Sequence, residues 1–197
     1  MKSWNILIAG VGGQGTLLTS RILGDLARQA GCDVKVTEVH GMAQRGGSVV
    51  THVRLADRVY SPVVEPGQAD ALLAFERLEA LRYAHFVRPG GLLLVNDQRI
   101  LPMPVIMGKQ AYPAAGLGDG VADGVEVVAL DGLALAQKAG DGRAVNTVLL
   151  GALSRRMGLG EDLWQRALET CVPAKALDVN RKAFVYGREA GENDGLE

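Results

Sequence analysis

Residues 6–15 read Ile6-Leu7-Ile8-Ala9-Gly10-Val11-Gly12-Gly13-Gln14-Gly15. A short apolar run ends at Gly10, and the glycines that follow have the spacing GxGxxG. Apolar residues then recur with a period near 3.6 as far as Ala30, and Gly31 ends the pattern. This order predicts a strand, a glycine turn and a helix. A second strand is predicted for residues 33–39, so the first forty residues indicate a βαβ unit.

The rest of the chain alternates between segments with the two-residue period of strands and segments with the 3.6-residue period of helices. Residues 48–55 alternate polar and apolar side chains, and Ala56-Asp57 is typical of a hairpin turn into a strand at 58–64. Residues 108–124 are rich in Gly, Ala and Pro and predict an irregular excursion. Buried strands are predicted at 71–75, 92–95 and 125–130, and helices at 76–86, 145–157, 163–171 and 174–188.

Strands that alternate with helices indicate an α/β fold. We expect a Rossmann-like, mainly parallel sheet with helices on both faces and a C-terminal helical segment. The chain has 197 residues, of which 48% are hydrophobic and 22% charged, and this composition suits one sizeable core. The expected domain is therefore a single unit over residues 1–191, followed by a disordered acidic tail over 192–197.

Composition excludes several classes of function. Lys and Arg total 21 against 22 Asp and Glu, so the net charge of −1 offers no field for nucleic acid or an anionic membrane. The first apolar run is far shorter than the ~20 residues that span a bilayer, and no signal-peptide pattern precedes it. With Cys32 and Cys171 alone, the sequence cannot supply a disulfide framework or a four-cysteine iron–sulfur site. We expect a cytoplasmic protein.

The glycine motif is the sharpest candidate site. Residues without Cβ let backbone N–H groups and a helix N-terminus approach an anion, usually a phosphate. A dinucleotide enzyme would also place an acidic residue at the end of the second strand, and Glu38 lies near that place without an evident adenine pocket after it. NAD(P), another phosphate group and simple helix packing all remain open. The candidate residues are Gly10, Gly12, Gly13, Gln14 and Gly15.

A second glycine-rich loop joins the predicted strands 33–39 and 48–55. Arg45 could clamp a carboxylate or phosphate that Gln44 orients, and the alternative is a surface ion pair. Gly46 and Gly47 complete this candidate set. The spacing of His40, His52 and His85 does not indicate a metal site, and no G-x-S-x-G nucleophile elbow occurs. The sequence therefore predicts no catalytic residue and no metal site in this chain.

One pattern imitates a thiamine site. Gly118-Asp119-Gly120 is followed at a suitable distance by Asn146, as if both supplied ligands to Mg²⁺. No apolar strand precedes Gly118, however, and Asn146 is predicted to open a buried helix. We expect a glycine-rich loop and a helix-capping asparagine instead.

Several segments resemble a known family. Residues 5–15 with Ser20-Arg21-Ile22-Leu23-Gly24 resemble the opening of the γ-type domain of pyruvate and other 2-oxoacid:ferredoxin oxidoreductases. Arg45-Gly46-Gly47 is similar to the whole superfamily, and the preceding His-Gly-Met-Ala-Gln at 40–44 is similar to the separate β subunit of indolepyruvate oxidoreductase. Further similar segments are 79–83, 88–91 and 143–151.

This resemblance implies a division of labour. In that family a large α subunit carries thiamine diphosphate, Mg²⁺ and [4Fe-4S] clusters, and it converts an aryl 2-oxoacid to an acyl-CoA while reducing ferredoxin. The chain would be the cofactor-free small subunit, inactive alone, with the large subunit, ferredoxin through that subunit, coenzyme A and the 2-oxoacid as partners. Its loops 12–15 and 44–47 would line the part of the site reached by coenzyme A or substrate.

Alternatives to this function remain. The chain could be the γ subunit for pyruvate or 2-oxoglutarate. On the glycine motif alone, it could be an NAD(P)-dependent dehydrogenase. On the fold alone, it could be a non-catalytic Rossmann-like binding module.

Overall fold

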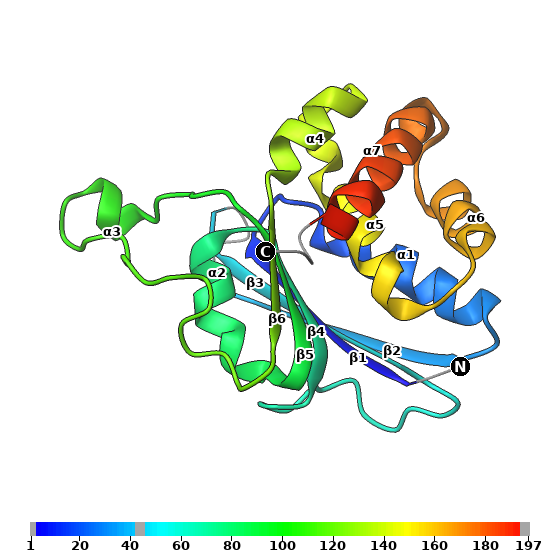
Figure 1. Ribbon diagram of the computed structural model, residues 1–197, viewed down its shortest axis with the longest axis horizontal. Helices are drawn as coiled ribbons and strands as arrows, with labels where there is room; N and C mark the ends of the chain where they lie inside the picture. Colours follow the sequence, from blue (N-terminus) through cyan, green and yellow to red (C-terminus); the bar gives the residue numbers. More distant parts are fainter. Residues whose placement is uncertain (1–2, 42–45, 194–197) are drawn as a thin grey trace.

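The computed structural model describes residues 3–41 and 46–193, with the backbone alone for residues 192 and 193 (Figure 1). Its strands form one six-stranded sheet in the order β2-β3-β1-β4-β5-β6. The strands are β1 (Trp4–Val11), β2 (Asp33–His40), β3 (Ser48–Ala56), β4 (Ala69–Ala74), β5 (Val87–Asn96) and β6 (Glu126–Leu130). The helices are α1 (Thr16–Gln29), α2 (Arg77–Tyr83), α3 (Met103–Ile106), α4 (Gly132–Ala139), α5 (Val145–Met157), α6 (Glu161–Cys171) and α7 (Ala174–Asn193), with short 3₁₀ turns η1 (Ala84–Phe86) and η2 (Gly142–Ala144).

The sheet is mainly parallel, as the sequence predicts. Strands β1, β4, β5 and β6 pair in parallel, with Ile8 opposite Leu73 in the β1–β4 register. Strand β3 runs antiparallel to both of its neighbours, β1 and β2. The predicted βαβ unit is therefore wrong in one respect, because β3 lies between β1 and β2 and separates the two strands that α1 connects.

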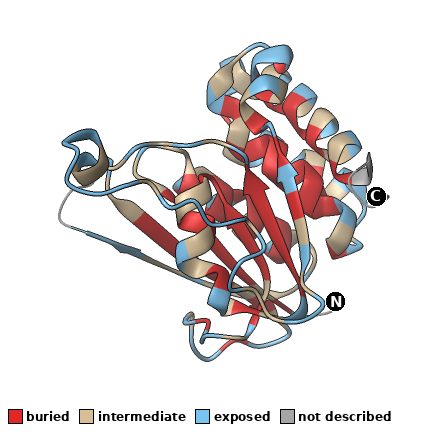
Figure 2. Cartoon of the chain, turned by 60° about the vertical axis from the view of Figure 1, so that its left-hand side comes forward, coloured by how far each residue is buried: buried red, intermediate tan, exposed pale blue. Residues whose placement is uncertain are grey.

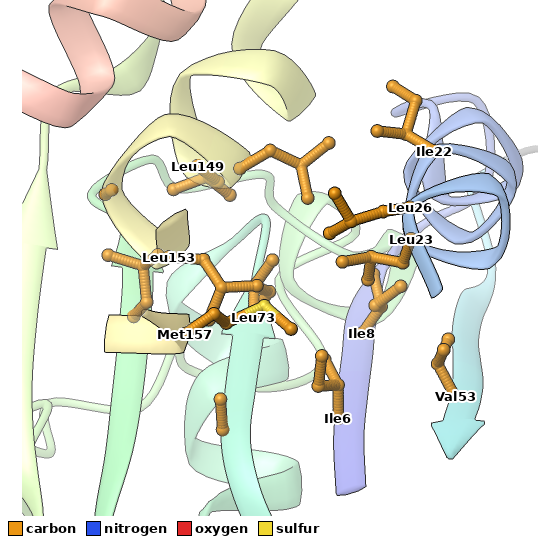
Figure 3. Packing of buried hydrophobic residues seen from close by; sticks show 14 of the residues in the cluster. Ile6, Ile8, Ile22, Leu23, Leu26, Val53, Leu73, Leu149, Leu153 and Met157 are labelled. Carbon is orange, nitrogen blue, oxygen red and sulfur yellow. The ribbon is translucent and has the colours of Figure 1, made fainter. Parts of the chain in front are cut away.

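Helices cover both faces of the sheet, which confirms the expected architecture. Alternate residues of β1 point to opposite faces: Ile6 and Ile8 face α1 and α5, whereas Leu7 and Ala9 face the α2 side. On the first face, Leu23 and Leu26 of α1 meet Leu149, Leu153 and Met157 of α5 over the strands (Figure 3). Figure 2 shows the centre of the sheet buried between these layers.

Helices α5 and α7 approach each other closely at two glycines. A Cβ built on Gly151 would lie 2.1 Å from the carbonyl oxygen of Phe184, and one on Gly187 would lie 1.9 Å from that of Val148. Real Cβ atoms cannot occupy such positions, so both glycines are required for the contact between the two backbones. Helix α7 thus packs onto the sheet through α5.

The strand predicted at 58–64 is wrong. Both edges of β3 are already paired, one with β1 and the other with β2, so no free edge remains for a hairpin partner. Side chains hold the segment instead. The N–H of Val64 donates to Nδ1 of His52 at 3.1 Å, and Arg54 Nη1 donates to the carbonyls of Ser61 and Val63 at 3.2 and 3.3 Å.

The remaining expectations differ in outcome. The helix predicted at 76–86 divides into α2 and η1, and the three C-terminal helices appear as α5, α6 and α7. The irregular stretch at 108–124 is confirmed, and it belongs to a largely exposed arm (residues 97–124) that also carries the unpredicted α3 (Figure 2). The unpredicted α4 follows β6. Helix α7 runs to Asn193, and the rest of the expected tail, 194–197, lies outside the described residues.

Across the described residues, none of the helices has both the length and the apolar character that a bilayer span requires.

Candidate functional site

A cavity lies at the carboxyl ends of β1, β4 and β5, from which the chain enters α1, α2 and the arm. In open α/β sheets this edge is where ligands bind. The cavity has a volume of about 410 Å³, which falls in the range of ~300–1,000 Å³ typical of small-molecule sites. Its lining combines apolar and polar side chains with loop backbone: Gly13, Gln14, Gly15, Leu18, Phe75, Gln98, Ile100, Leu133, Gly142, Arg143, Val145 and Asn146.

The first glycine loop presents the N-terminus of α1 to this cavity. Gly15 is the N-cap residue with φ of +88°, and no side chain caps the helix there. The first turn of α1 contains no acidic residue. Because the first N–H groups of a helix lack intrahelical acceptors, this end can donate to an anion. The geometry of Gly13 and Gly15 is therefore compatible with the anion binding that the sequence predicts.

Gln14 and Gly10 have structural roles in the same loop. The N–H of Val11 donates to Gln14 Oε1 at 2.8 Å, and Gln14 Nε2 donates to the carbonyl oxygen of Phe75 at 3.2 Å. These bonds tie the end of β1 to the end of β4. A Cβ on Gly10 would lie 3.0 Å from Gln14 Oε1 and 3.2 Å from Phe75 Cβ, so Gly10 makes room for the bridge.

The two glycine loops predicted from the sequence meet. The N–H of Gly12 donates to the carbonyl oxygen of Gly47 at 2.9 Å, and the N–H of Gly46 donates to that of Gly12 at 3.4 Å. Gln44 and Arg45, the side chains expected to bind an anion here, lie outside the described residues. The structure thus brings the backbones of both candidate loops to one place.

The second loop is anchored to α2 through a buried carboxylate. Ser48, the first residue of β3, donates from Oγ to Glu79 Oε2, and Arg82 Nε donates to Glu79 Oε1 at 3.3 Å. Burial raises the pKa of Glu79, and the bonds from Ser48 and Arg82 partly oppose that shift. The position of β3, and with it that of Gly47, therefore depends on an ionisable contact.

Arg143 and Asn146 stand at the other side of the cavity. Arg143 is exposed at the rim, where its Nη2 lies 2.6 Å from Asp141 Oδ2, and this guanidinium lowers the pKa of Asp141 to about 2. Asn146 is 2% exposed. The capping role expected for Asn146 is wrong: it is the second residue of α5, and Ala144 occupies the cap position without a side-chain bond.

Sequence reasoning missed two buried polar residues that shape the cavity. Glu76 is 1% exposed and accepts hydrogen bonds from the N–H of Leu78 (2.6 Å), the N–H of Ile100 (3.0 Å) and the hydroxyl of Tyr112 (2.6 Å). It therefore caps α2 and fixes the arm. Burial and the bond to Glu76 raise the pKa of Tyr112. Glutamate is not among the residues that commonly cap helices, so its position after the apolar run at 71–75 gave no capping signal.

The second missed residue is Asn96, at the end of β5. Its Nδ2 donates to the carbonyl oxygen of Phe75 at 3.0 Å, and its Oδ1 accepts from the N–H of Gly132 at 3.1 Å. Asn96 thereby joins the ends of β4 and β5 to the start of α4. Both polar atoms of its side chain are hydrogen-bonded, and Asn96 therefore supports the structure around the cavity.

Similarity to known proteins extends over almost the whole chain. The family profile described as pyruvate ferredoxin/flavodoxin oxidoreductase matches residues 5–190. The chain belongs to this family.

Individual members agree with that assignment. Indolepyruvate oxidoreductase subunit IorB of Thermococcus kodakarensis is 42% identical over 197 residues, covering 98% of each chain. The subunit of the same name from Archaeoglobus fulgidus is 39% identical, covering 93% of this chain and 92% of its own. The crystal structure of a keto/oxoacid ferredoxin oxidoreductase gamma subunit from Geobacter sulfurreducens superposes with a TM-score of 0.72 at 26% identity, over 96% of this chain and 98% of that one. The resemblance inferred from the motifs is confirmed.

Within this family fold, the apparent thiamine motif does not assemble. Asp119 lies in a turn whose neighbours Leu117 and Val121 pack on the α2 face of the sheet, and its Oδ2 accepts from the N–H of Gly116 at 2.8 Å. Asn146 belongs to α5 on the opposite face. The two side chains therefore cannot bind one ion, and the described residues contain no group of three or more His, Cys, Asp or Glu side chains that could hold a metal.

The arrangement also disfavours a dinucleotide. Glu38 sits on β2, two strand spacings or ~10 Å from β1, because β3 intervenes. Its Oε2 accepts from Thr51 Oγ1 at 3.2 Å. The cavity beside it measures about 210 Å³, below the ~300 Å³ at which small-molecule sites begin. Glu38 lines this cavity together with Gly12 and Gly13, so the small volume of the cavity is what argues against a nucleotide on the glycine loop.

Proposed function

We propose that the chain is the small subunit of an indolepyruvate oxidoreductase, which decarboxylates an aryl 2-oxoacid oxidatively to an acyl-CoA and reduces ferredoxin. The observation that carries the proposal is 42% identity, along nearly the full length of both chains, to a subunit of that name. A larger partner subunit would hold thiamine diphosphate, Mg²⁺ and the [4Fe-4S] clusters. Two cysteines in the whole sequence agree with that division. A ferredoxin-linked enzyme of this kind would act in the cytoplasm.

The chain's own contribution would be binding and positioning. The cavity at the carboxyl edge of the sheet offers the unfilled N–H groups of α1, one guanidinium at its rim and an apolar wall that includes Leu18, Phe75 and Ile100. Such a surface suits an anionic group attached to a less polar body, a description that fits both coenzyme A and an aryl 2-oxoacid. The glycine loops would let the partner or the ligand approach the backbone closely.

Reconstitution with the large subunit of the native host tests this function. We expect ferredoxin or viologen dye to be reduced only when both subunits, coenzyme A and a 2-oxoacid are present, with the highest kcat/KM for indolepyruvate. Pyruvate and 2-oxoglutarate serve as competing substrates, and NADH titrated into the isolated chain tests the dehydrogenase alternative. The isolated chain should be colourless and inactive. A brown isolated chain with full turnover, or a complex that prefers pyruvate, would contradict the proposal.

A further inference from the structure

Asn146 holds a buried donor that lacks an acceptor. Its Nδ2 atom is buried and has no hydrogen-bond partner in the part of the chain that the structure describes. In two other buried asparagines the side-chain amide does have an acceptor. Asn96 donates to the Phe75 carbonyl at 3.0 Å, and Asn180 Nδ2 donates to the Ala176 carbonyl at 2.8 Å. Leaving a buried amide unpaired costs free energy, so the unpaired state of Asn146 requires a reason.

The position of Asn146 suggests that reason. Its side chain lies against the start of α1, because a Cβ on Gly15 would be 3.4 Å from Asn146 Cγ. It also lines both the site cavity and a second cavity of about 440 Å³, and the two share Leu18 and Arg143 as well. Lys175 adds a second cation to the wall of the latter. Asn146 is therefore where both cavities meet the N-terminus of α1.

The charges around Asn146 favour an anion. The helix end contributes N–H donors, and Lys175 contributes a positive charge. Asp141, the acidic residue in the lining of the second cavity, is paired with Arg143 at 2.6 Å, so this pair adds no net charge. A cation or a hydrogen-bond donor would find little to bind here. A carboxylate or phosphate oxygen would accept the hydrogen bond that Asn146 Nδ2 can donate.

We propose that Asn146 is a positioning residue that donates a hydrogen bond from Nδ2 to an anionic group of the ligand. The anion shares the N-terminus of α1, and Lys175 lies on the wall of the adjoining cavity. The identity of the ligand rests on the proposed function: a phosphate of coenzyme A and the carboxylate of the 2-oxoacid have the same acceptor chemistry. The role of the amide itself follows from the geometry alone.

Side-chain amide signals test the contact directly. The sequence contains five asparagines, so selective ¹⁵N-asparagine labelling of the full chain gives few signals, and the pair lost in Asn146→Leu belongs to Asn146. Inorganic phosphate, coenzyme A and indolepyruvate are titrated separately. We expect the Asn146 amide to shift saturably with coenzyme A or with indolepyruvate, which identifies the phosphate or the carboxylate as the source, while the Asn96 amide stays fixed. A weak shift with phosphate alone would place a phosphate group there.

Substitution separates positioning from structure. In the reconstituted complex, Asn146→Leu should raise KM for one substrate by roughly 10- to 100-fold, the loss expected for one hydrogen bond to a charged group, and change kcat little. Its Tm should equal or exceed that of the parent, because an unpaired donor has been removed. Asn96→Leu is the matched control and should lower Tm by about 2–8 °C, since its amide is fully bonded. Asn146→Asp keeps the shape, removes the donor and should raise the same KM.

The results decide the proposal in each case. Unchanged KM values for both substrates in Asn146→Leu, or a Tm that falls as far as in Asn96→Leu, would overturn it. A complex that turns over no 2-oxoacid would refute the proposed function, and the Asn146 inference would then be decided by the amide signals alone. In that case a saturable shift with any of the three anions supports it, and three silent titrations overturn it.

Discussion

Glycine serves opposite purposes in two regions of this molecule. At the α5–α7 contact, a Cβ on Gly187 would collide with the Val148 carbonyl at 1.9 Å, so the residue is small because no space exists. In the β1–α1 loop, Gly13 has φ of +107° and no described atom within 4 Å of its Cβ position. At Gly13 the residue is small although the space beside its backbone is empty. Glycines in the sequence look alike in both regions, and only packing distinguishes a structural glycine from one that leaves a surface open.

The largest effect is expected at the helix contact. Gly187→Ala should destabilise the protein by about 3–5 kcal/mol, because the methyl group must force two helix backbones apart. Urea unfolding measures the change. The matched control is Gly24→Ala in α1, where no described atom lies within 4 Å of the added methyl; it should stabilise by about 0.5–1 kcal/mol through helix propensity. Equal stability for the two variants would abolish the contrast between the regions.

The bridge between β1 and β4 should give the next largest effect. Gln14→Leu removes the acceptor for Val11 and one of two donors to Phe75, and should cost about 1–3 kcal/mol in unfolding free energy. Ligand affinity should fall only to the extent that the substitution displaces the loop between β1 and α1. Calorimetry of unfolding, paired with KM values in the complex, measures both. If stability is unchanged and one KM rises sharply, Gln14 binds ligand and the structural role is wrong.

Gly13→Ala tests the open region. Its positive φ makes the substitution cost about 1–2 kcal/mol, yet the methyl group meets no described neighbour. We therefore expect a folded variant whose complex forms but turns over more slowly, because Gly13 lines the site cavity and the methyl group would occupy open space beside its backbone. Stability and kcat/KM are measured on the same preparation. Full activity would mean that nothing approaches this backbone.

The smallest effect is a dependence of stability on pH that arises from the buried carboxylate of Glu79. Burial raises the pKa of Glu79 above its ordinary value near 4.5, so the stability gained from its protonated form is fully present below that value and is lost as pH rises through the folded pKa. Glu79→Gln cannot ionise. Its stability relative to the parent should therefore increase as pH rises above about 4.5, as followed by urea unfolding.

Asp141→Asn provides the control of opposite sign. The hydrogen bond from Arg143 lowers the pKa of Asp141 to about 2, so its contribution is complete above the ordinary value of 3.8 and is lost only as pH falls toward 2. Across the range used for Glu79→Gln, the difference between Asp141→Asn and the parent should stay constant. A slope in this control, or none for Glu79→Gln, would contradict the assignment of the ionisable contact to Glu79.

Local patterns predicted most of the elements but not their neighbours. Apolar runs gave β1, β4 and β5, and the 3.6-residue period gave α1 and α5, because burial of one face leaves a direct trace in the sequence. Strand order leaves none. The insertion of β3 between β1 and β2 removed the free edge that a strand at 58–64 would have needed. Helix α4 was missed because it has only eight residues and its buried positions, Gly132, Ala136 and Ala139, hold small residues that leave a weak apolar pattern.

The candidate site was predicted in part. Spacing located both glycine loops, and the structure joins them through Gly12 and Gly47. Spacing could not show that Gln14 bonds to Phe75, 61 residues away, or that Asn146 leaves its amide unpaired. Those facts depend on which side chains meet in three dimensions. Asn146 was set aside as a cap because residue type and helix position suggested one, and the helix geometry assigns the cap to Ala144.

The place of β3 in the sheet also constrains the order of assembly. Among the described strands, β2 pairs only with β3, and β3 separates β2 from β1. Strand β2 can therefore join the sheet together with β3 or after it, and pairing of β3 with β1 closes the Gly12–Gly47 hydrogen bond. The two glycine loops thus meet when β3 pairs with β1, and backbone amides of β2 should never show slower hydrogen exchange than those of β3.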